Sequence, residues 1–403
     1  MGMLSYEQAL LQLLAGAPVL GATESRPTQS ACGRVLAAAQ VSAIFVPPLD
    51  NSSMDGYALR AADVPVAGTR LKVAQRIAAG SVGHALAAGT AARIFTGAPL
   101  PAGADAIVMQ ELTSHENDVV TINHVPSPGD WIRRRGQDIN GGEKILGAGT
   151  RLLPQHLGLA ASVGLAALPV FRRLRVALFS TGDELVMPGE VAPSELPPGA
   201  IYNSNRFLLL GLLQQLGCEV ADLGIIPDTL AATREALRQA AADADLILTS
   251  GGVSVGEEDH VKPAVEAEGT LDLWKIAINP GKPLAFGRVG SASFIGLPGN
   301  PVSSLVTFLM LVRPFILKAQ GAAATAVRSL ALRADFDGPR ADPRREFLRA
   351  RRNDAGGLDL FPNQNAGVLS SAVWADGLID NPPNQVIRRG DLVSFLPFSE
   401  LLY

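Results

Sequence analysis

Four short loops carry the side chains best suited to chemistry. They span residues 180–184, 227–228, 250–259 and 297–301, and each follows an apolar run typical of a buried strand. Glycine in such loops lets backbone N–H groups face a phosphate, and a following helix adds partial positive charge. No single loop is diagnostic, but four at one sheet edge predict an anion site. Its candidate substrate-binding residues are Ser250, Gly251, Gly252, Ser254, Pro298, Asn300 and Pro301.

Three carboxylates belong to the same loops: Glu184, Asp228 and Asp259. Acids beside an anion site would repel the ligand unless a divalent cation lies between them. Mg²⁺ binds in this way, through one or two carboxylates and the phosphates of a substrate. The alternative is that Asp228 and Asp259 only begin helices, where aspartate is favoured. Three acids at neighbouring strand ends favour the metal site, with all three as candidate ligands.

Basic side chains complete the predicted site. Lys275 and Lys282 flank the turn at 279–281, and Arg344 and Arg345 precede a predicted strand in the last part of the chain. Lysine and arginine at such places are usually only solvated. The sequence Pro-Gly-Lys-Pro, however, fixes the backbone around Lys282. It therefore predicts an ammonium group aimed at an oxyanion.

Other chemistries find little support in the residue spacing. The five histidines show neither HxxxH nor HxH, which argues against a histidine zinc site. Ser180 and Ser254 lack the GxSxG context of a nucleophile elbow, so an acyl-enzyme is not expected. The polar segments 50–58, 95–103 and 134–139 are open to a simpler interpretation as ordinary turns. The chemistry that remains is phosphoryl or oxyanion handling with a metal.

The elements that position these residues follow from local patterns. Strands alternate with helices from about residue 173, which predicts a mainly parallel sheet with ligands beyond the carboxyl ends of its strands. Short strands with glycine turns predict a β-rich module at 49–140 and a compact β domain or barrel at 323–403.

Helix starts can also be predicted. Ser5 and Gln8 form a capping box before a helix whose apolar face includes Leu11. Ser204 is expected to cap a later helix, and Pro301 to occupy the first position of another.

Composition excludes several classes of protein. The chain has 403 residues and a formal charge of −4, with 18% charged and 47% hydrophobic residues. Neither nucleic acid nor an anionic membrane would attract it globally, and wholesale disorder is excluded. Its two cysteines cannot form a disulfide framework. The longest apolar run, 302–317, is interrupted by Arg313 and Pro314 and is shorter than the roughly 20 residues of a membrane span. With no signal peptide visible, the expected location is the cytoplasm.

Several longer strings resemble one family. They are NSSMDGYA (51–58), IFTGAPLPAGADAIVMQE (94–111), STGDEL (180–185), YNSN (202–205), TSGGVSVGEEDHVK (249–262), PGKPLAFG (280–287) and GLPGNPVSS (296–304). In this order they resemble the molybdenum-insertion family of MoeA-type molybdopterin molybdenumtransferases, to which the E-domain of gephyrin is also similar.

The resemblance implies a multidomain α/β fold. Its parts would be an extended N-terminal linker domain at 1–48 and 141–172, an inserted β-rich lid at 49–140, a mainly parallel three-layer α/β domain that binds molybdopterin at 173–322, and a C-terminal β-barrel at 323–403. It also implies a homodimer in which the lid of one subunit completes the site of the other.

The resemblance further implies a reaction. Its substrates would be adenylylated molybdopterin and molybdate, with Mg²⁺ as cofactor and with AMP and molybdenum cofactor as products. The molybdopterin adenylyltransferase and cofactor-accepting enzymes are the implied partners. Carried over by position, the catalytic residues are Asp55, Asp138, Glu184, Asp228, Asp259, Lys275 and Lys282. The further substrate-binding residues are Thr96, Pro283, Ser303, Arg345 and Ser371.

The sequence departs from the family pattern at three places. Asn279 stands where a second lysine is common, and Gln137 replaces the usual acid beside Asp138. Residues 364–367 stand where a Gly-Ser pair is typical. All three departures weaken the expectation that the site binds an oxyanion tightly.

Two other functions stay open at this point. The α/β domain also resembles that of a molybdopterin adenylyltransferase, which precedes the insertion step. A non-catalytic scaffold of the gephyrin E-domain kind is the second alternative.

Overall fold

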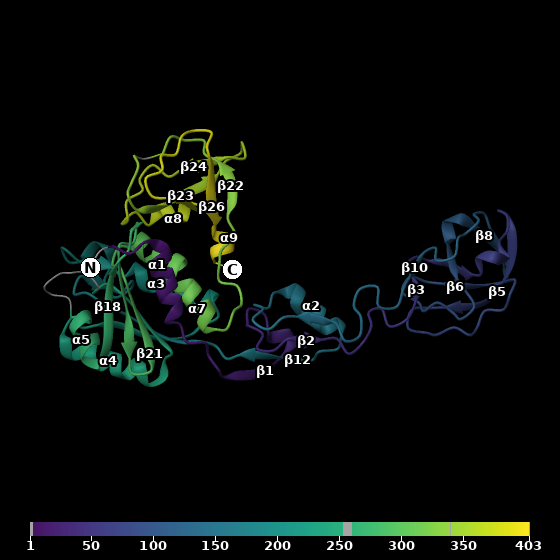
Figure 1. Cartoon of the computed structure of the whole chain (residues 1–403), viewed down its shortest axis with the longest axis horizontal. Coiled ribbons are helices and arrows are strands. Elements are labelled where there is room, and N and C mark those ends of the chain that lie inside the picture. The colour runs from purple at the N-terminus through teal and green to yellow at the C-terminus, as the bar shows by residue number, and fades with distance from the viewer. Residues whose placement is uncertain (1–2, 253–259, 339, 403) are drawn as a thin grey trace.

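The molecule is elongated, with its parts arranged along one axis (Figure 1). The computed structural model describes residues 3–252, 260–338 and 340–402. The α/β part and the C-terminal part lie together at one end, the lid lies at the other, and a narrow middle part joins them. The chain crosses the middle part twice, because β1 (Thr23–Pro27) pairs antiparallel with β12 (Ala167–Phe171).

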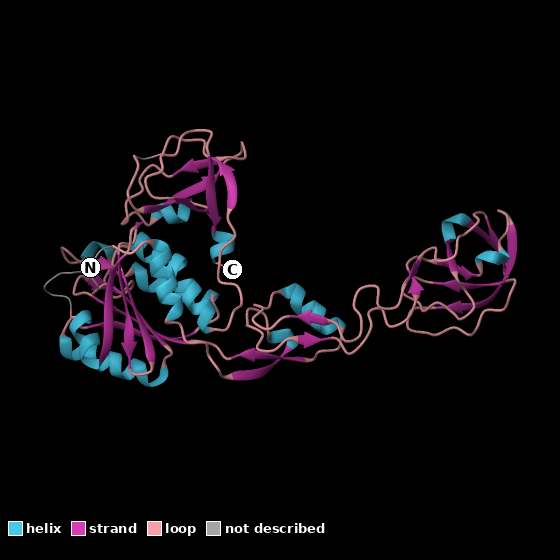
Figure 2. Cartoon of the chain, in the orientation of Figure 1, coloured by secondary structure: helices cyan, strands magenta, loops and turns pink. Residues whose placement is uncertain are grey.

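A six-stranded sheet forms the centre of the α/β part (Figure 2). Its strands are β13 (Arg175–Thr181), β16 (Glu219–Ile226), β17 (Leu246–Ser250), β18 (Gly269–Lys275), β20 (Pro283–Val289) and β21 (Ala292–Leu297). The order is β16, β13, β17, β21, β20, β18. The first four strands are parallel, whereas β20 runs antiparallel to β21 and to β18. The carboxyl ends of the four parallel strands therefore share one edge.

Helices cover both faces of this sheet. Alternate residues of β13 enter two different cores, with Ala177 and Phe179 on one side and Val176 and Leu178 on the other. The first side packs on α4 (Leu230–Asp243) and α5 (Val261–Glu268). The second packs on α1 (Tyr6–Ala15), α3 (Ser204–Gln215), α6 (Pro301–Thr307), a π-helical turn (Phe308–Val312) and α7 (Arg313–Ala319). Burial on both faces explains why these strands are apolar without alternation.

The start of α1 follows its local sequence. The side chain of Ser5 accepts a hydrogen bond from the Gln8 N–H, and the Gln8 side chain accepts one from the Ser5 N–H, so the predicted capping box is confirmed. The expected apolar face was wrong in one respect. Ala9 and Leu13 are fully buried, whereas 71% of Leu11 is exposed, because α1 packs on α7 through a narrower stripe.

Two later helix starts differ in how well they were predicted. Pro301 begins α6 as expected. The cap of α3, however, is Asn203 rather than Ser204. The Asn203 side chain accepts a hydrogen bond from the Arg206 N–H, and asparagine caps as well as serine does.

The lid contains a second six-stranded sheet. Its strands are β4 (Gly56–Leu59), β5 (Thr69–Ile77), β6 (Thr90–Ile94), β7 (Ala106–Met109), β8 (Thr113–Glu116) and β9 (Val119–Ile122). They lie in the order β7, β4, β6, β5, β9, β8. One face buries Leu59 and Val120, and the other buries Ile77 and Ile94. The lid therefore has its own core and packs as an independent unit.

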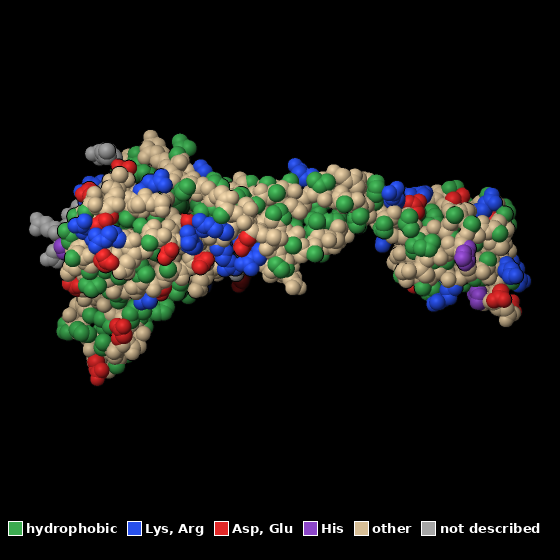
Figure 3. Space-filling view, turned by 90° about the horizontal axis from the view of Figure 1, so that it is seen from below, with side chains coloured by type: hydrophobic (Ala, Val, Ile, Leu, Met, Phe, Trp, Pro, Cys, Tyr) green, Lys and Arg blue, Asp and Glu red, His purple; other side chains and the backbone are tan. Residues whose placement is uncertain are grey.

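The middle part is small and largely uncharged. Its further elements are β2 (Gln40–Val41), β11 (Lys144–Leu146), α2 (Pro154–Ser162) and, at the lid junction, β3 (Asn51–Ser52) and β10 (Ile132–Arg133). The Arg34 guanidinium joins its two chain passes, because it donates to the Glu24 carboxylate and to the Phe171 carbonyl at 2.7 Å. The face drawn in Figure 3 carries few charged side chains here.

The C-terminal part is built mostly from antiparallel strands. They are β22 (Leu330–Arg333), β23 (Arg345–Arg352), β24 (Leu358–Leu360), β25 (Gly377–Asn381) and β26 (Leu392–Pro397), with the short helices α8 (Ser370–Trp374) and α9 (Phe398–Leu401). A strand of the α/β part, β19 (Ile278–Asn279), extends this sheet by pairing parallel with β23. The order is β19, β23, β25, β26, β22, with β24 beside β23. A closed barrel stays a prediction.

One long apolar helix needs an explanation. Residues Pro301–Ala319 are long and apolar enough to cross a membrane by composition, but 94% of that stretch is buried inside the protein. It packs between the sheet and α1. Packing in the core therefore accounts for its composition.

Candidate active site

A cavity of about 910 Å³ opens at the carboxyl ends of the parallel strands. Loops after β13, β17 and β21 form one wall, and the turn between β19 and β20 forms another. Arg344, Ala366 and Gly367 of the C-terminal part close a third side. The cavity therefore lies where the α/β part meets the C-terminal part.

Glycine is required in the loop after β17. Gly251 and Gly252 have φ angles of +88° and +67°, which disfavour any other residue. A Cβ on Gly252 would lie 2.3 Å from the Val261 side chain. The Gly251 N–H donates to the Leu297 carbonyl at 3.0 Å, which ties this loop to the end of β21.

Lys282 is the cavity-lining cation whose charge is not matched by a described acid. It is exposed and lines the cavity, and it makes no ion pair with another described residue. Gly281 before it has φ +116°, and a Cβ there would lie 2.5 Å from the Thr307 hydroxyl. The turn is thus held close to α6, and the aim of the Lys282 ammonium at an oxyanion stays a prediction.

The second lining cation, Arg344, is already paired. Its guanidinium donates to the Asp342 carboxylate at 2.6 and 2.9 Å. These hydrogen bonds hold the pKa of Asp342 below its usual range, even though partial burial opposes the shift. Arg344 therefore brings little net charge to the cavity.

Asn279 lies against two acids. Its amide nitrogen is 3.4 Å from the carboxylates of both Asp342 and Glu346. Glu346 is only 4% exposed, and this burial raises its pKa despite a hydrogen bond from Asn381. Asparagine at this position donates to the acids without adding positive charge to the cavity it lines.

The predicted metal ligands are separated in the structure. Glu184 lines the cavity, whereas Asp228 follows the edge strand β16 and does not. Asp259 lies outside the described residues. Within residues 3–252, 260–338 and 340–402, no three His, Cys, Asp or Glu side chains gather as a metal site.

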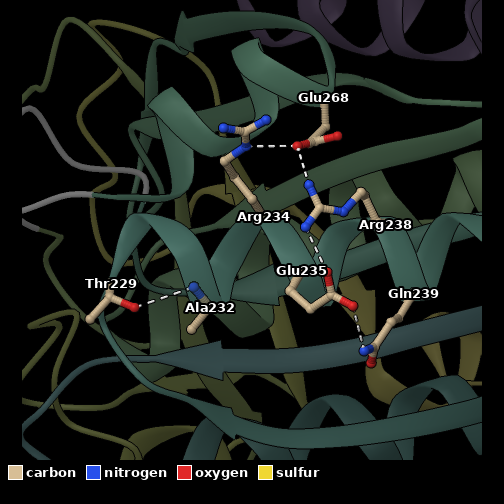
Figure 4. A network of polar contacts seen from close by, with 7 residues as sticks. All are labelled: Thr229, Ala232, Arg234, Glu235, Arg238, Gln239 and Glu268. Carbon is tan, nitrogen blue, oxygen red and sulfur yellow. Dashed lines mark hydrogen bonds and ion pairs between the residues drawn. The ribbon is translucent and has the colours of Figure 1, made fainter.

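The helix after Asp228 is fixed at its start and along its middle turns (Figure 4). The Thr229 hydroxyl accepts a hydrogen bond from the Ala232 N–H and begins α4. Arg234 and Arg238 both bind the carboxylate of Glu268 at the end of α5, at 2.7 and 3.0 Å. The loop that holds Asp228 is therefore fixed by a cap and by ion pairs behind it.

Arg345 and Ser371 do not line the cavity. The Arg345 guanidinium binds the Asp380 carboxylate at 2.5 and 3.0 Å and also pairs with Glu7, so its charge is matched. Ser371 is completely buried, and its hydroxyl accepts a hydrogen bond at 3.2 Å from a different arginine, Arg349.

Arg349 is a buried cation that makes no ion pair with any residue the structure describes. It is 1% exposed, and desolvation lowers its pKa to about 10. Its Nη1 donates to the Phe347 carbonyl, but its Nη2 has no hydrogen-bond partner in the described part of the chain. Its N–H binds the side chain of Gln364, just before the cavity-lining residues 366–367.

The lid residues lie far from this cavity in the same chain (Figure 1). Asp55 accepts two hydrogen bonds from Thr96, from its N–H and its hydroxyl, both at 2.8 Å. These bonds hold the pKa of Asp55 below its usual range. Asp138 is exposed at the base of the lid.

The structure thus divides the residues predicted from sequence. Those that line this cavity are Glu184, Ser250, Gly251, Gly252, Lys282, Pro283, Pro298, Asn300, Pro301 and Ser303. Those that lie elsewhere are Asp55, Thr96, Asp138, Asp228, Lys275, Arg345 and Ser371. Ser254 and Asp259 fall outside the described residues.

Sequence reasoning also missed some polar groups. Asn203 and Asn205 line the cavity, although the string YNSN had only marked a resemblance. Arg344 lines it too, beside the Arg345 that was chosen. β23 reads REFLRARR, with four arginines in eight residues, so no sequence signal singled out Arg349 as the buried one.

The fold and cavity define a multidomain α/β protein with a cavity at the carboxyl ends of its parallel strands. Residues 4–164 match the family model of the MoeA N-terminal region (domain I and II). Residues 177–318 match a "Probable molybdopterin binding domain", and residues 331–398 match the MoeA C-terminal region (domain IV). The chain belongs to the MoeA family, so the resemblance seen in its motifs is confirmed.

Relatives are similar over most of the chain. The molybdopterin molybdenumtransferase of Haemophilus influenzae is 45% identical over 79% of this chain and 78% of its own length. Molybdopterin molybdenumtransferase 2 of Mycobacterium tuberculosis is 39% identical over 89% and 91%. The crystal structure of the molybdopterin biosynthesis moeA protein from Pyrococcus horikoshii OT3 has a TM-score of 0.85 and 28% identity, covering 98% of this chain and 100% of that one.

Proposed function

We propose that this chain is a molybdopterin molybdenumtransferase, a transferase of molybdenum cofactor biosynthesis. It inserts molybdate into adenylylated molybdopterin, cleaves the phosphoanhydride and releases AMP and molybdenum cofactor. The observation that carries the proposal is the cavity that joins glycine loops, Lys282 and the C-terminal part. The names of the relatives agree with it.

The cavity suits two negative groups that must approach each other. Backbone N–H groups near Gly251 and Gly252 would receive a phosphate. Lys282 would offset the charge of the oxyanion, which otherwise repels the phosphoanhydride. Pro283 and Ser303 also line the cavity and would shape its oxyanion end.

The oxyanion end extends toward the C-terminal part. Ser371 and Arg345 were the residues expected here, but the charge of Arg345 is matched by Asp380 and Glu7. Arg349, which binds Ser371 and has no paired acid among the described residues, is the better source of positive charge. Arg349 does not line the cavity either, so we propose it as a positioning residue that acts through Gln364 on the cavity-lining residues 366–367.

Mg²⁺ is part of the proposal. One carboxylate, Glu184, lines the cavity beside loops suited to phosphate, and Mg²⁺ accepts a single carboxylate with substrate phosphates and water. The donor set therefore fits the ion, with Asp228 and Asp259 as further candidate ligands. When bound, Mg²⁺ would neutralise charge on the phosphoanhydride. Lys275 ends β18 opposite Pro283 and would act from outside the cavity rim.

We also propose a homodimer. The lid of one chain lies at the far end from its own cavity, which supports a site completed by the lid of a second copy (Figure 1). Asp55, Thr96 and Asp138 would then orient the substrate or water across the interface. The three-layer α/β domain, the C-terminal barrel, the expected domain boundaries, a cytoplasmic location and the implied protein partners belong to the same proposal.

Molybdate-dependent release of AMP tests this function. Purified protein is incubated with adenylylated molybdopterin, with and without molybdate and Mg²⁺, and AMP is measured. Release that needs both ions supports the proposal. Formation of adenylylated molybdopterin from ATP and molybdopterin would favour an adenylyltransferase instead, and no turnover at all would favour a scaffold.

A further inference from the structure

Two asparagines of the cavity wall have no role in the site described so far. Asn203 and Asn205 flank the start of α3, and both line the cavity. They are almost fully buried, at 2% and 8% exposed. Buried amides normally use both their donor and their acceptor. Each of these uses only one.

The direction of each amide is fixed by a backbone group. The Asn203 oxygen accepts from the Arg206 N–H at 3.1 Å, so its nitrogen is the free end. The Asn205 nitrogen donates to the Gly299 carbonyl at 2.7 Å, so its oxygen is the free end. Neither free atom has a hydrogen-bond partner in the described part of the chain. One donor and one acceptor therefore remain unsatisfied in the wall of the cavity.

A ligand that satisfies both atoms must itself offer an acceptor and a donor. Fully deprotonated molybdate or phosphate oxygens can accept from Asn203 but have no hydrogen for Asn205. The edge of a nitrogen heterocycle has both kinds of group side by side. Leaving either asparagine atom unpaired in a desolvated wall is unfavourable, so such a ligand would be selected.

We propose that Asn203 and Asn205 form a subsite that recognises the polar edge of a nitrogen heterocycle. This inference rests on the proposed function, whose substrate contains two such rings, a pterin and an adenine. Asn205 binds Gly299, which belongs to the loop expected to contact phosphate. The subsite would thus hold the ring beside the phosphates. This would fix where the phosphates lie along the cavity relative to Lys282.

Substitutions at Asn203 can remove the free donor and keep the helix cap. Asn203→Ser retains a capping oxygen without charge, but its shorter side chain withdraws the donor from the cavity. Asn203→Asp keeps the capping oxygen and replaces the donor by an acceptor. Asn205→Leu removes the free acceptor at similar volume. Thermal unfolding of each variant shows whether the fold is retained.

Binding of AMP, molybdopterin and molybdate, which carries no proton near neutral pH, is then measured by calorimetry for the wild type and the variants. We expect Asn203→Ser to weaken binding of one heterocycle by about tenfold or more and to leave molybdate binding unchanged. Asn205→Leu should weaken the same heterocycle, but it also removes the hydrogen bond to Gly299, so Asn203→Ser is the discriminating variant. Loss confined to AMP identifies adenine as the ring, and loss confined to molybdopterin identifies the pterin. Asn203→Asp should weaken the same ligand at least as much.

Two results would overturn the subsite. Either the variants bind both heterocycles as the wild type does, or the wild type binds neither of them. Failure of the proposed function looks different. In that case the heterocycle binding would depend on the asparagines, but the wild type would release no AMP from adenylylated molybdopterin.

Discussion

At the scale of single residues, the site depends on which charged side chains already have a partner. Arg344 is held by Asp342, and Arg345 by Asp380 and Glu7, so neither is free to bind an anion strongly. Charge that is already matched adds little to a ligand site. The unmatched cations near the cavity decide its affinity for an oxyanion.

Replacing Lys282 with alanine tests the cation that lines the cavity. We expect molybdate-dependent AMP release to fall on the order of 10²–10³-fold, because an aimed donor facing developing charge is lost. Lys144→Ala is the control, since Lys144 is exposed and belongs to β11, which pairs with β2 of the middle part. Equal rates for Lys282→Ala and the wild type would remove Lys282 from the mechanism.

Replacing Arg349 with methionine separates function from stability. A buried cation without a paired acid is unfavourable for folding, so the melting temperature should stay unchanged or rise. The molybdate concentration for half-maximal rate should rise by about tenfold, because the positive charge behind Gln364 and the cavity-lining residues 366–367 is lost. Arg351→Met is the control on the same strand, at an exposed position. A lower melting temperature with unchanged molybdate dependence would mean that Arg349 is only structural.

At the scale of elements, α1 connects the two parts that form the cavity. It packs on α7 of the α/β part, and the Tyr6 hydroxyl donates to the Met310 carbonyl at 3.3 Å. The Tyr6 ring meets Phe347 of the C-terminal part edge-on at 5.6 Å and lies 5.2 Å from the Arg345 guanidinium. The N-terminal helix therefore holds the C-terminal part over the cavity.

The variant Tyr6→Ala should loosen this connection. Loss of a largely buried ring should lower the free energy of unfolding by about 3 kcal/mol, measured by urea denaturation. Hydrogen exchange should increase in β23 but not in the lid, because the lid has its own core. Leu11→Ala is the matched control on the same helix, since Leu11 is 71% exposed. Similar losses in both variants would show that α1 matters only through its own helical stability.

At the scale of the whole molecule, the parts of the predicted site lie at opposite ends of one chain (Figure 1). The lid carries Asp55 and Thr96, whereas the cavity carries Lys282. The middle part is stiffened by the paired strands β1 and β12. This pairing supports an extended chain in which the lid stays away from its own cavity, and a second copy could bring a lid to it.

Mixed dimers test this arrangement. A chain with Asp55→Asn and a chain with Lys282→Ala, each inactive alone, are co-expressed with different tags. Random pairing would give mixed dimers in which one site of two has both residues intact, restoring about a quarter of the wild-type rate. A double variant carrying both changes in one chain, paired with itself, is the control. If the mixed sample stays inactive, the lid does not act across a dimer.

Local signals in the sequence were enough for several elements. Ser5 with Gln8 predicted the start of α1, and Pro301 that of α6, because capping depends on residues within one turn. The alternation of strands and helices predicted a multidomain α/β fold. The exposure of Leu11 was missed, since helical spacing alone does not say how wide the contact with a neighbouring helix is. The cap at Asn203 was missed because asparagine and serine, which stand next to each other here, cap a helix equally well.

The sequence by itself determined that the chain belongs to the MoeA family and that glycine loops and Lys282 lie at strand ends, because these features depend on short strings. Only the tertiary structure decided which cations are neutralised, that Asn203 and Asn205 keep one free atom each, and that the lid lies far from its own cavity. The physical reason is that pairing and desolvation depend on residues far apart in the chain, such as Arg345 and Glu7.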